Sequence, residues 1–239
     1  MQVVSFVSPR RVPQWADAEA VVAGITLQAG VHYTGLCLNE HRLTRAIATG
    51  RLKIEGSINL CASPAFLARN QNSTPEKRRE TRRAMIAMFR ANGVPVTSGG
   101  ISAALGCNFQ GEITTAQLMA TIAEVFDLAN ESGVVLDNIG LSDTMGWATL
   151  GQITRTMGTI REAYPDQSLT LHLHDTRGMA IANAYAGLMM GVADFDTSIG
   201  GIGGCPFAAH KGAAGNLCTE DFAFMCEEWA LPPALILMR

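Results

Sequence analysis

The sequence of 239 residues has few aromatic side chains, no large excess of charge of either sign and no long hydrophobic run. With 3 Trp, 3 Tyr and 9 Phe, its interior must be built mainly from aliphatic side chains. Its 18 basic and 21 acidic residues lack the basic excess of a dedicated nucleic-acid binder, so we expect no nucleic-acid partner. The longest uncharged apolar stretch, residues 180–193, is shorter than the roughly 20 residues that a membrane span needs. We therefore expect no membrane span.

Cysteine is sparse and unpaired. Six cysteines stand singly in the chain and none forms a C-x-x-C pair, so we expect neither a disulfide framework nor a zinc ribbon. The first nine residues lead directly into Arg10 and Arg11, without the charged lead and small-residue cleavage site of a secretory signal. The sequence therefore predicts a cytoplasmic protein.

Short β-branched or apolar runs alternate with longer segments of helical period, which is typical of βα units around a parallel sheet. This repetition over the whole length favours a TIM (β/α)8-type barrel over a doubly wound sheet, for which we would expect a Gly-rich turn after the first strand. We predict one TIM-barrel domain over residues 1–239, incomplete because only seven strands are recognisable. These strands are residues 3–7, 33–38, 54–61, 94–103, 138–142, 169–174 and 194–199.

Two helices have clear ends. Thr74 can cap a helix that begins at Pro75 and ends at residues 92–93. The arginines at 78–83 could form a phosphate-binding patch, but a solvated helix face interleaved with acids is the favoured interpretation. A second helix is expected to begin near Thr114 and to end near Gly133.

Two histidines in one predicted strand indicate a metal site. On an extended strand His172 and His174 share a face, while Leu171 and Leu173 face the opposite, helix-covered layer. The pair lies at the carboxyl end of its strand, where TIM barrels place active sites. Two core histidines with backbone or carboxylate partners are the alternative, but two imidazoles on one aliphatic strand would lose hydration without a shared partner. Asp175 should point away and either support a histidine or cap the following helix.

Further polar residues follow other predicted strands. The glycines at 200–204 and Cys205 form either a mobile lid or an ordinary turn-rich connection. The amide oxygen of Asn216 suits a hard divalent ion beside imidazoles, and Thr219 is expected to be a helix N-cap. Asp143 could bind substrate, transfer a proton or support a metal-bound histidine, although an Asp near a helix start is more often a cap.

Together these segments resemble the 3-hydroxy-3-methylglutaryl-CoA lyase family, within the metal-dependent barrel lyases and aldol-type synthases. The matching motifs run over nearly the whole chain. The H-x-H-D-T motif is shared with the synthases, whereas the G-G-C-P loop is typical of the lyases. The motifs are S-F-V-S-P at 5–9, V-P-Q-W-A-D at 12–17, S-D-T at 142–144, H-L-H-D-T at 172–176, G-G-C-P-F at 203–207 and G-N-L-C-T-E-D at 215–221.

The resemblance implies a divalent-metal-dependent retro-Claisen cleavage of a 3-hydroxy-3-methylglutaryl thioester into acetoacetate and acetyl-CoA. The metal, Mg²⁺ or Mn²⁺, would chelate the tertiary hydroxyl, and Cys205 is the candidate proton donor in a loop that closes over the acyl group. An acyl-CoA substrate and a homodimer are the expected partners. The implied site residues are the metal ligands His172, His174 and Asn216, the catalytic residues Cys205, Asp143 and Glu220, and the substrate-binding residues Asn39 and Ser5.

The sequence also departs from the family pattern. The family's first strand carries an adjacent Arg-Asp pair that this sequence lacks, and Gln2 stands about where the family has an active-site Glu. Residues 209–212 lengthen the cysteine loop by about two residues, which indicates a different acyl preference. We expect the natural product to begin some 30 to 40 residues earlier, the size of one βα unit, rather than the chain to be a degraded relative.

Three other functions stay open at this stage. The chain could be an aldol-type synthase that joins acetyl-CoA to a 2-oxo acid, or a lyase for another branched hydroxyacyl-CoA. It could also be an inactive barrel that binds another subunit through an exposed strand edge.

Overall fold

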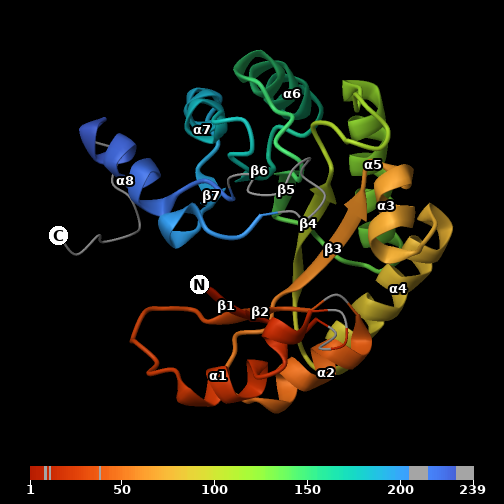
Figure 1. Cartoon of the computed structure of the whole chain (residues 1–239). Coiled ribbons are helices and arrows are strands. Elements are labelled where there is room, and N and C mark those ends of the chain that lie inside the picture. The colour runs from red at the N-terminus through yellow and green to blue at the C-terminus, as the bar shows by residue number, and fades with distance from the viewer. Residues whose placement is uncertain (8–9, 11, 38, 205–214, 230–239) are drawn as a thin grey trace.

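A computed structural model describes residues 1–7, 10, 12–37, 39–204 and 215–229. Seven parallel strands form two sheets with helices on their outer side (Figure 1). In the smaller sheet β1 (Gln2–Ser5) pairs with β2 (Thr34–Leu36). The larger sheet has the order β3-β4-β5-β6-β7. Its strands are β3 (Gly56–Cys61), β4 (Val96–Ser102), β5 (Asn138–Asp143), β6 (Ser168–Leu173) and β7 (Asp194–Asp196).

All seven predicted strands are present, and the architecture is that of a partial TIM barrel. The second and seventh strands are shorter than predicted. The chain leaves β7 after Asp196 and turns through a 3-10 segment, Ile199–Gly201, in which Gly200 adopts a φ of 63°. Within the described residues no hydrogen-bonded ladder joins β2 to β3, so the barrel wall is open there.

The helices cover the strands from outside (Figure 1). The two predicted helices are confirmed: Thr74 caps α4 by accepting from the Lys77 amide, and Thr114 and Gln117 form a capping box at the start of α5. The prediction for Thr219 was wrong, because Cys218 is the N-cap and the Thr219 hydroxyl contacts the Thr197 hydroxyl at 2.8 Å instead. The helices are α1 (Ala18–Gly24), α2 (Glu40–Ala48), α3 (Pro64–Gln71), α4 (Pro75–Ala91), α5 (Thr115–Glu131), α6 (Leu150–Ala163), α7 (Ala180–Met189) and α8 (Thr219–Glu228).

Side chains alternate between the two faces of the larger sheet. Along β3, β5 and β6 every second residue is buried against the helices, as Ile58, Leu141 and Leu171 are. The residues between them face the interior that the two sheets enclose. The aliphatic core is therefore the layer between strands and helices.

The interpretation of the arginine cluster as a solvated face was only partly right. Arg79 and Arg83 lie outside and pair with Glu124 and Glu131 at 2.8 and 2.9 Å. Arg78 and Arg82 are buried, because their spacing of four places both on the inward face of α4.

Arg78 and Arg82 fill the open part of the wall. The Nε–H of Arg78 donates to the carbonyl of Asn59 at 3.2 Å, on the edge strand β3. Arg82 lines the interior, where burial and the charge of Arg78 lower its pKa to about 9. Buried guanidinium groups thus occupy the wall where the two sheets do not meet.

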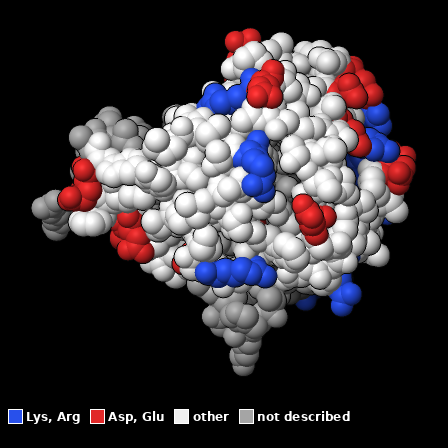
Figure 2. Space-filling view, turned by 90° about the horizontal axis from the view of Figure 1, so that it is seen from above, with Lys and Arg blue, Asp and Glu red and all other residues white. Residues whose placement is uncertain are grey.

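Surface charge is mixed. Acidic and basic side chains are interspersed over the face shown in Figure 2 and leave wide uncharged areas between them. Among the described residues, no helix combines the length and the hydropathy that crossing a membrane requires.

Candidate metal centre and cavity

His172 on β6 and His174, which directly follows that strand, meet at the carboxyl end of the sheet. The Nε2 atoms of His172 and His174 lie 3.2 Å apart, and the ring planes cross at 72°. Leu171 and Leu173 are fully buried on the opposite face of the strand. The predicted orientation of the pair is therefore confirmed.

The outer nitrogen of each ring contacts an acceptor. His174 Nδ1 lies 2.7 Å from the Thr144 carbonyl oxygen, and His172 Nδ1 lies 3.1 Å from a carboxylate oxygen of Asp196. Because a carbonyl and a carboxylate can only accept, both rings carry their proton on Nδ1 when neutral. The lone pairs of both Nε2 atoms then face each other, an arrangement that repels unless a proton or a cation lies between them.

Asn216 adds a third lone pair to the centre. Its backbone forms an isolated bridge with His174, and its side-chain amide group donates to the Ile202 carbonyl at 2.8 Å. The Oδ1 atom is buried and accepts no hydrogen bond. Gly203 packs against this amide so closely that an added Cβ would lie 2.8 Å from Nδ2. The structure thus brings the two predicted imidazole ligands together and places Asn216 beside His174 through the backbone bridge.

These three groups fit a hard divalent cation. Two neighbouring ligands of an octahedral Mg²⁺-type ion, each at about 2.1 Å, lie about 3 Å apart, close to the 3.2 Å between the Nε2 atoms. Burial, and then the charge of His172, lower the pKa of His174. That ring is therefore neutral near pH 7, as a ligand must be. A cation held here would also satisfy the buried amide oxygen of Asn216, which has no donor.

Asp143 shapes the turn beside the histidines. It is 1% exposed, and its two oxygens accept from the amides of Trp147 and Ala148 at 2.7 and 3.0 Å. Burial raises the pKa of this carboxyl to about 6, against the lowering effect of the two amides. The turn that it holds carries the Thr144 carbonyl, so Asp143 acts on the orientation of His174 through the backbone.

The other predicted residues lie at separate places. Glu220 accepts from the Gly200 amide at 2.8 Å and from the Cys218 thiol at 3.1 Å, and these hydrogen bonds lower its pKa. Asn39 caps α2 by accepting from the Arg42 amide at 3.2 Å. Ser5 is buried on β1, and its hydroxyl has no hydrogen-bond partner.

Asp175 and Cys205 complete the predicted set. Asp175 accepts from the amide of Ala180, the first residue of α7, at 2.7 Å, whereas the N-cap of that helix is Met179. Cys205 and the rest of its predicted loop, residues 205–214, lie outside the described residues.

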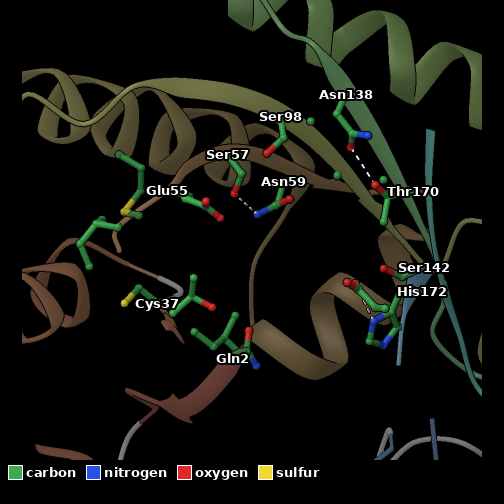
Figure 3. A pocket seen from close by; sticks show the side chains of 18 of the residues that line it. Gln2, Cys37, Glu55, Ser57, Asn59, Ser98, Asn138, Ser142, Thr170 and His172 are labelled. Atoms are coloured by element: carbon green, nitrogen blue, oxygen red, sulfur yellow. Dashed lines mark hydrogen bonds and ion pairs between the residues drawn. The ribbon is translucent and has the colours of Figure 1, made fainter. Parts of the chain in front are cut away.

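Below the histidines the two sheets enclose a cavity of about 450 Å³. His172 and Asp196 line one side of it. Gln2 and Cys37 line it from the side of the smaller sheet (Figure 3). Figure 3 also shows hydroxyl and amide side chains of β3 to β6 along the opposite wall. The candidate metal centre therefore faces a polar interior through His172.

A family model, HMGL-like, matches residues 12–238 of the chain. The chain belongs to the HMGL-like family. It is 37% identical over 225 residues to the hydroxymethylglutaryl-CoA lyase, mitochondrial, of Gallus gallus, covering 94% of this chain and 72% of that protein. It is also 35% identical over 239 residues to the 3-hydroxy-3-methylglutaryl-CoA lyase, cytoplasmic, of Mus musculus, covering 100% of this chain and 66% of that protein.

Solved structures give the same result for this HMGL-like chain. The hydroxymethylglutaryl-CoA lyase of Pseudomonas aeruginosa superposes with a TM-score of 0.83 at 36% identity, over 97% of this chain and 73% of that one. The lyase of Acinetobacter baumannii, in complex with coenzyme A and 3-methylmalate, gives 0.81 at 33% identity, over 96% and 71%. The chain spans 58–72% of the length of the curated relatives it matches.

Sequence reasoning missed two parts of this HMGL-like centre. Asp196 pairs in register with His172, and the alternation D-F-D at 194–196 was the available signal. Thr144 contacts His174 through its backbone carbonyl, so the identity of its side chain could not have predicted this contact.

The raised pKa of Asp143 predicts a pH-dependent loss of stability. An unfolded carboxyl ionises near its ordinary value of 3.8, whereas the folded one holds its proton to about pH 6. The folded state therefore binds more protons between these values, and stability falls as pH rises through them. Without added metal, wild type should lose about 1–3 kcal/mol relative to Asp143→Asn between pH 4 and 7, measured by urea unfolding. Exposed Asp166→Asn is the control, and wild-type and Asp143→Asn profiles that run parallel would contradict the assignment.

Proposed function

We propose that this chain is a hydroxymethylglutaryl-CoA lyase-like carbon-carbon lyase. It cleaves a 3-hydroxy-3-methylglutaryl-CoA-type thioester to acetoacetate and acetyl-CoA. The observation that carries the proposal is the approach of His172 Nε2 to His174 Nε2 at 3.2 Å, with Asn216 bridged to His174 through its backbone and its Oδ1 buried without a donor. The similarity to lyases from vertebrates and bacteria, one of them in complex with coenzyme A, supports an acyl-CoA substrate.

His172, His174 and Asn216 would hold Mg²⁺ or Mn²⁺. Such an ion supplies Lewis acidity, which makes a tertiary hydroxyl easier to deprotonate. The chain's own contribution is orientation: the Thr144 carbonyl and the Asp196 carboxylate keep both Nε2 lone pairs directed at the ion.

The bond changes are those of a retro-Claisen cleavage. A base takes the proton of the tertiary hydroxyl, the adjacent carbon-carbon bond breaks, and its electron pair passes to the thioester as an enolate. The Cys205 thiol then donates a proton to the enolate carbon, which gives acetyl-CoA, and the other fragment leaves as acetoacetate. Asp143 would act by positioning His174 through the turn that it holds, Glu220 is the proposed catalytic carboxylate, and Asn39 and Ser5 are the proposed substrate-binding residues.

We extend the proposal to the cellular location and the oligomeric state of the protein. A cytoplasmic homodimer is our expectation, although the similar lyases include proteins named mitochondrial as well as cytoplasmic. The second candidate function is a lyase or aldol-type synthase for another hydroxyacyl-CoA. Gln2, an uncharged amide in the cavity wall, is the observation that favours this second candidate.

Cleavage is tested with a panel of acyl-CoA thioesters and Mg²⁺ or Mn²⁺. The chain is used as printed and also extended at its N-terminus by the first βα unit of a lyase relative. We expect acetoacetate from 3-hydroxy-3-methylglutaryl-CoA, and at least a hundredfold lower rate for Cys205→Ala because the enolate loses its proton donor. Failure of every thioester of this type with both proteins would falsify the lyase assignment.

Metal binding is tested by calorimetric titration with Mn²⁺. His174→Ala removes one ligand and should weaken binding at least tenfold, about 1.4 kcal/mol. Exposed His41→Ala on α2 is the matched control and should bind as wild type does. Indistinguishable curves for wild type and His174→Ala would count against the metal site.

A further inference from the structure

The side chains that the larger sheet directs into the cavity are unusually polar for a barrel. TIM barrels usually fill this space with layers of Val, Ile and Leu. Here the strand register aligns Ser57, Ser98 and Asn138 in one row of the cavity wall. The next row, nearer the histidines, is Asn59, Gly100, Gly140 and Thr170. Hydroxyls, amides and glycines thus stand where aliphatic packing is expected.

Hydrogen bonds order the two sides of this wall. Asn59 donates from Nδ2 to the Ser57 hydroxyl at 2.7 Å, and the Thr170 hydroxyl donates to Asn138 Oδ1 at 3.1 Å (Figure 3). Ordered amides and hydroxyls that line a cavity offer both donors and acceptors to whatever occupies it.

Gly140 leaves space that the packing does not require. An added Cβ at neighbouring Gly99 would lie 2.6 Å from Val125, so glycine is needed there, whereas one at Gly100 would lie 2.1 Å from Asn59 Oδ1 and would displace that side chain. At Gly140 the nearest atoms would lie at 3.7 and 3.9 Å, an ordinary contact. The wall thus has room for a Cβ at position 140, and the glycine leaves that space to the cavity.

We infer that the two rows under His172 form an acyl-specificity pocket for 3-hydroxyacyl-CoA thioesters whose C3 substituent is longer than methyl and ends in a hydroxyl group. The inference rests on the proposed function. Gly140 and Thr170 are two residues below the Ser142–His172 level, or about 6.6 Å. A 3-hydroxypropyl group, with about four bonds of roughly 1.5 Å each, is on the scale of this separation. An alkyl end of equal length would displace water from the row and leave its polar groups unpaired.

Binding of unreactive analogues tests the pocket without requiring turnover. Glutaryl-CoA thioesters carrying methyl, propyl or 3-hydroxypropyl at C3 lack the tertiary hydroxyl and so cannot be cleaved. Calorimetry with the full chain and Mg²⁺ should show the hydroxypropyl analogue binding at least tenfold tighter than the propyl analogue. Gly140→Val fills the row and should abolish this preference, whereas Gly158→Ala, on α6, should keep it. If Gly140→Val does not fold, Gly140→Ala replaces it and should at least halve the preference.

Two results would overturn the inference. One is a wild type that does not prefer the hydroxypropyl analogue, including a wild type that binds none of the three. The other is a preference that survives the folded Gly140 variant. Cleavage of 3-hydroxy-3-methylglutaryl-CoA is measured on the same samples. If the chain prefers the hydroxypropyl analogue but cleaves nothing, the proposed function is wrong and the inferred pocket is still supported.

Discussion

Two hydrogen-bond acceptors outside the imidazole rings determine what this site can do. The Thr144 carbonyl and the Asp196 carboxylate each accept from an Nδ1–H, so both Nε2 lone pairs converge at 3.2 Å. Neither ring can relieve the repulsion by changing tautomer without losing its outer partner. The buried Oδ1 of Asn216 has the same need for a positive partner. Buried lone pairs without a donor are costly in a folded protein unless a cation offsets their desolvation.

The fold supplies each part of this arrangement from a different βα unit. The parallel register sets Asp196 of β7 beside His172 of β6, and the buried carboxylate of Asp143 at the end of β5 holds the turn that presents the Thr144 carbonyl. Asn216 reaches His174 through a bridge between chain segments that follow β6 and precede α8. Bringing these elements to one edge is the general property of parallel barrels that lets function reside at the carboxyl ends of strands.

Periodicity explains why much of this was predictable. A spacing of two put His172 and His174 on one face, and cap chemistry placed the ends of α4 and α5. What could not be predicted depends on contacts between distant segments. The burial of Arg78 and Arg82 follows from which face of α4 meets the open wall, and the polar interior follows from strand register. The partner of His174 is a backbone carbonyl, which no side-chain pattern encodes.

The central claim concerns protons on two rings, and nitrogen-15 NMR of the histidine side chains measures them most directly. At pH 8 without metal, the account predicts that His172 and His174 both carry their proton on Nδ1, and that Mg²⁺ shifts both Nε2 resonances while leaving both Nδ1 protons in place. A proton on Nε2 of either ring at this pH, or Nε2 resonances that Mg²⁺ leaves unchanged, would contradict it.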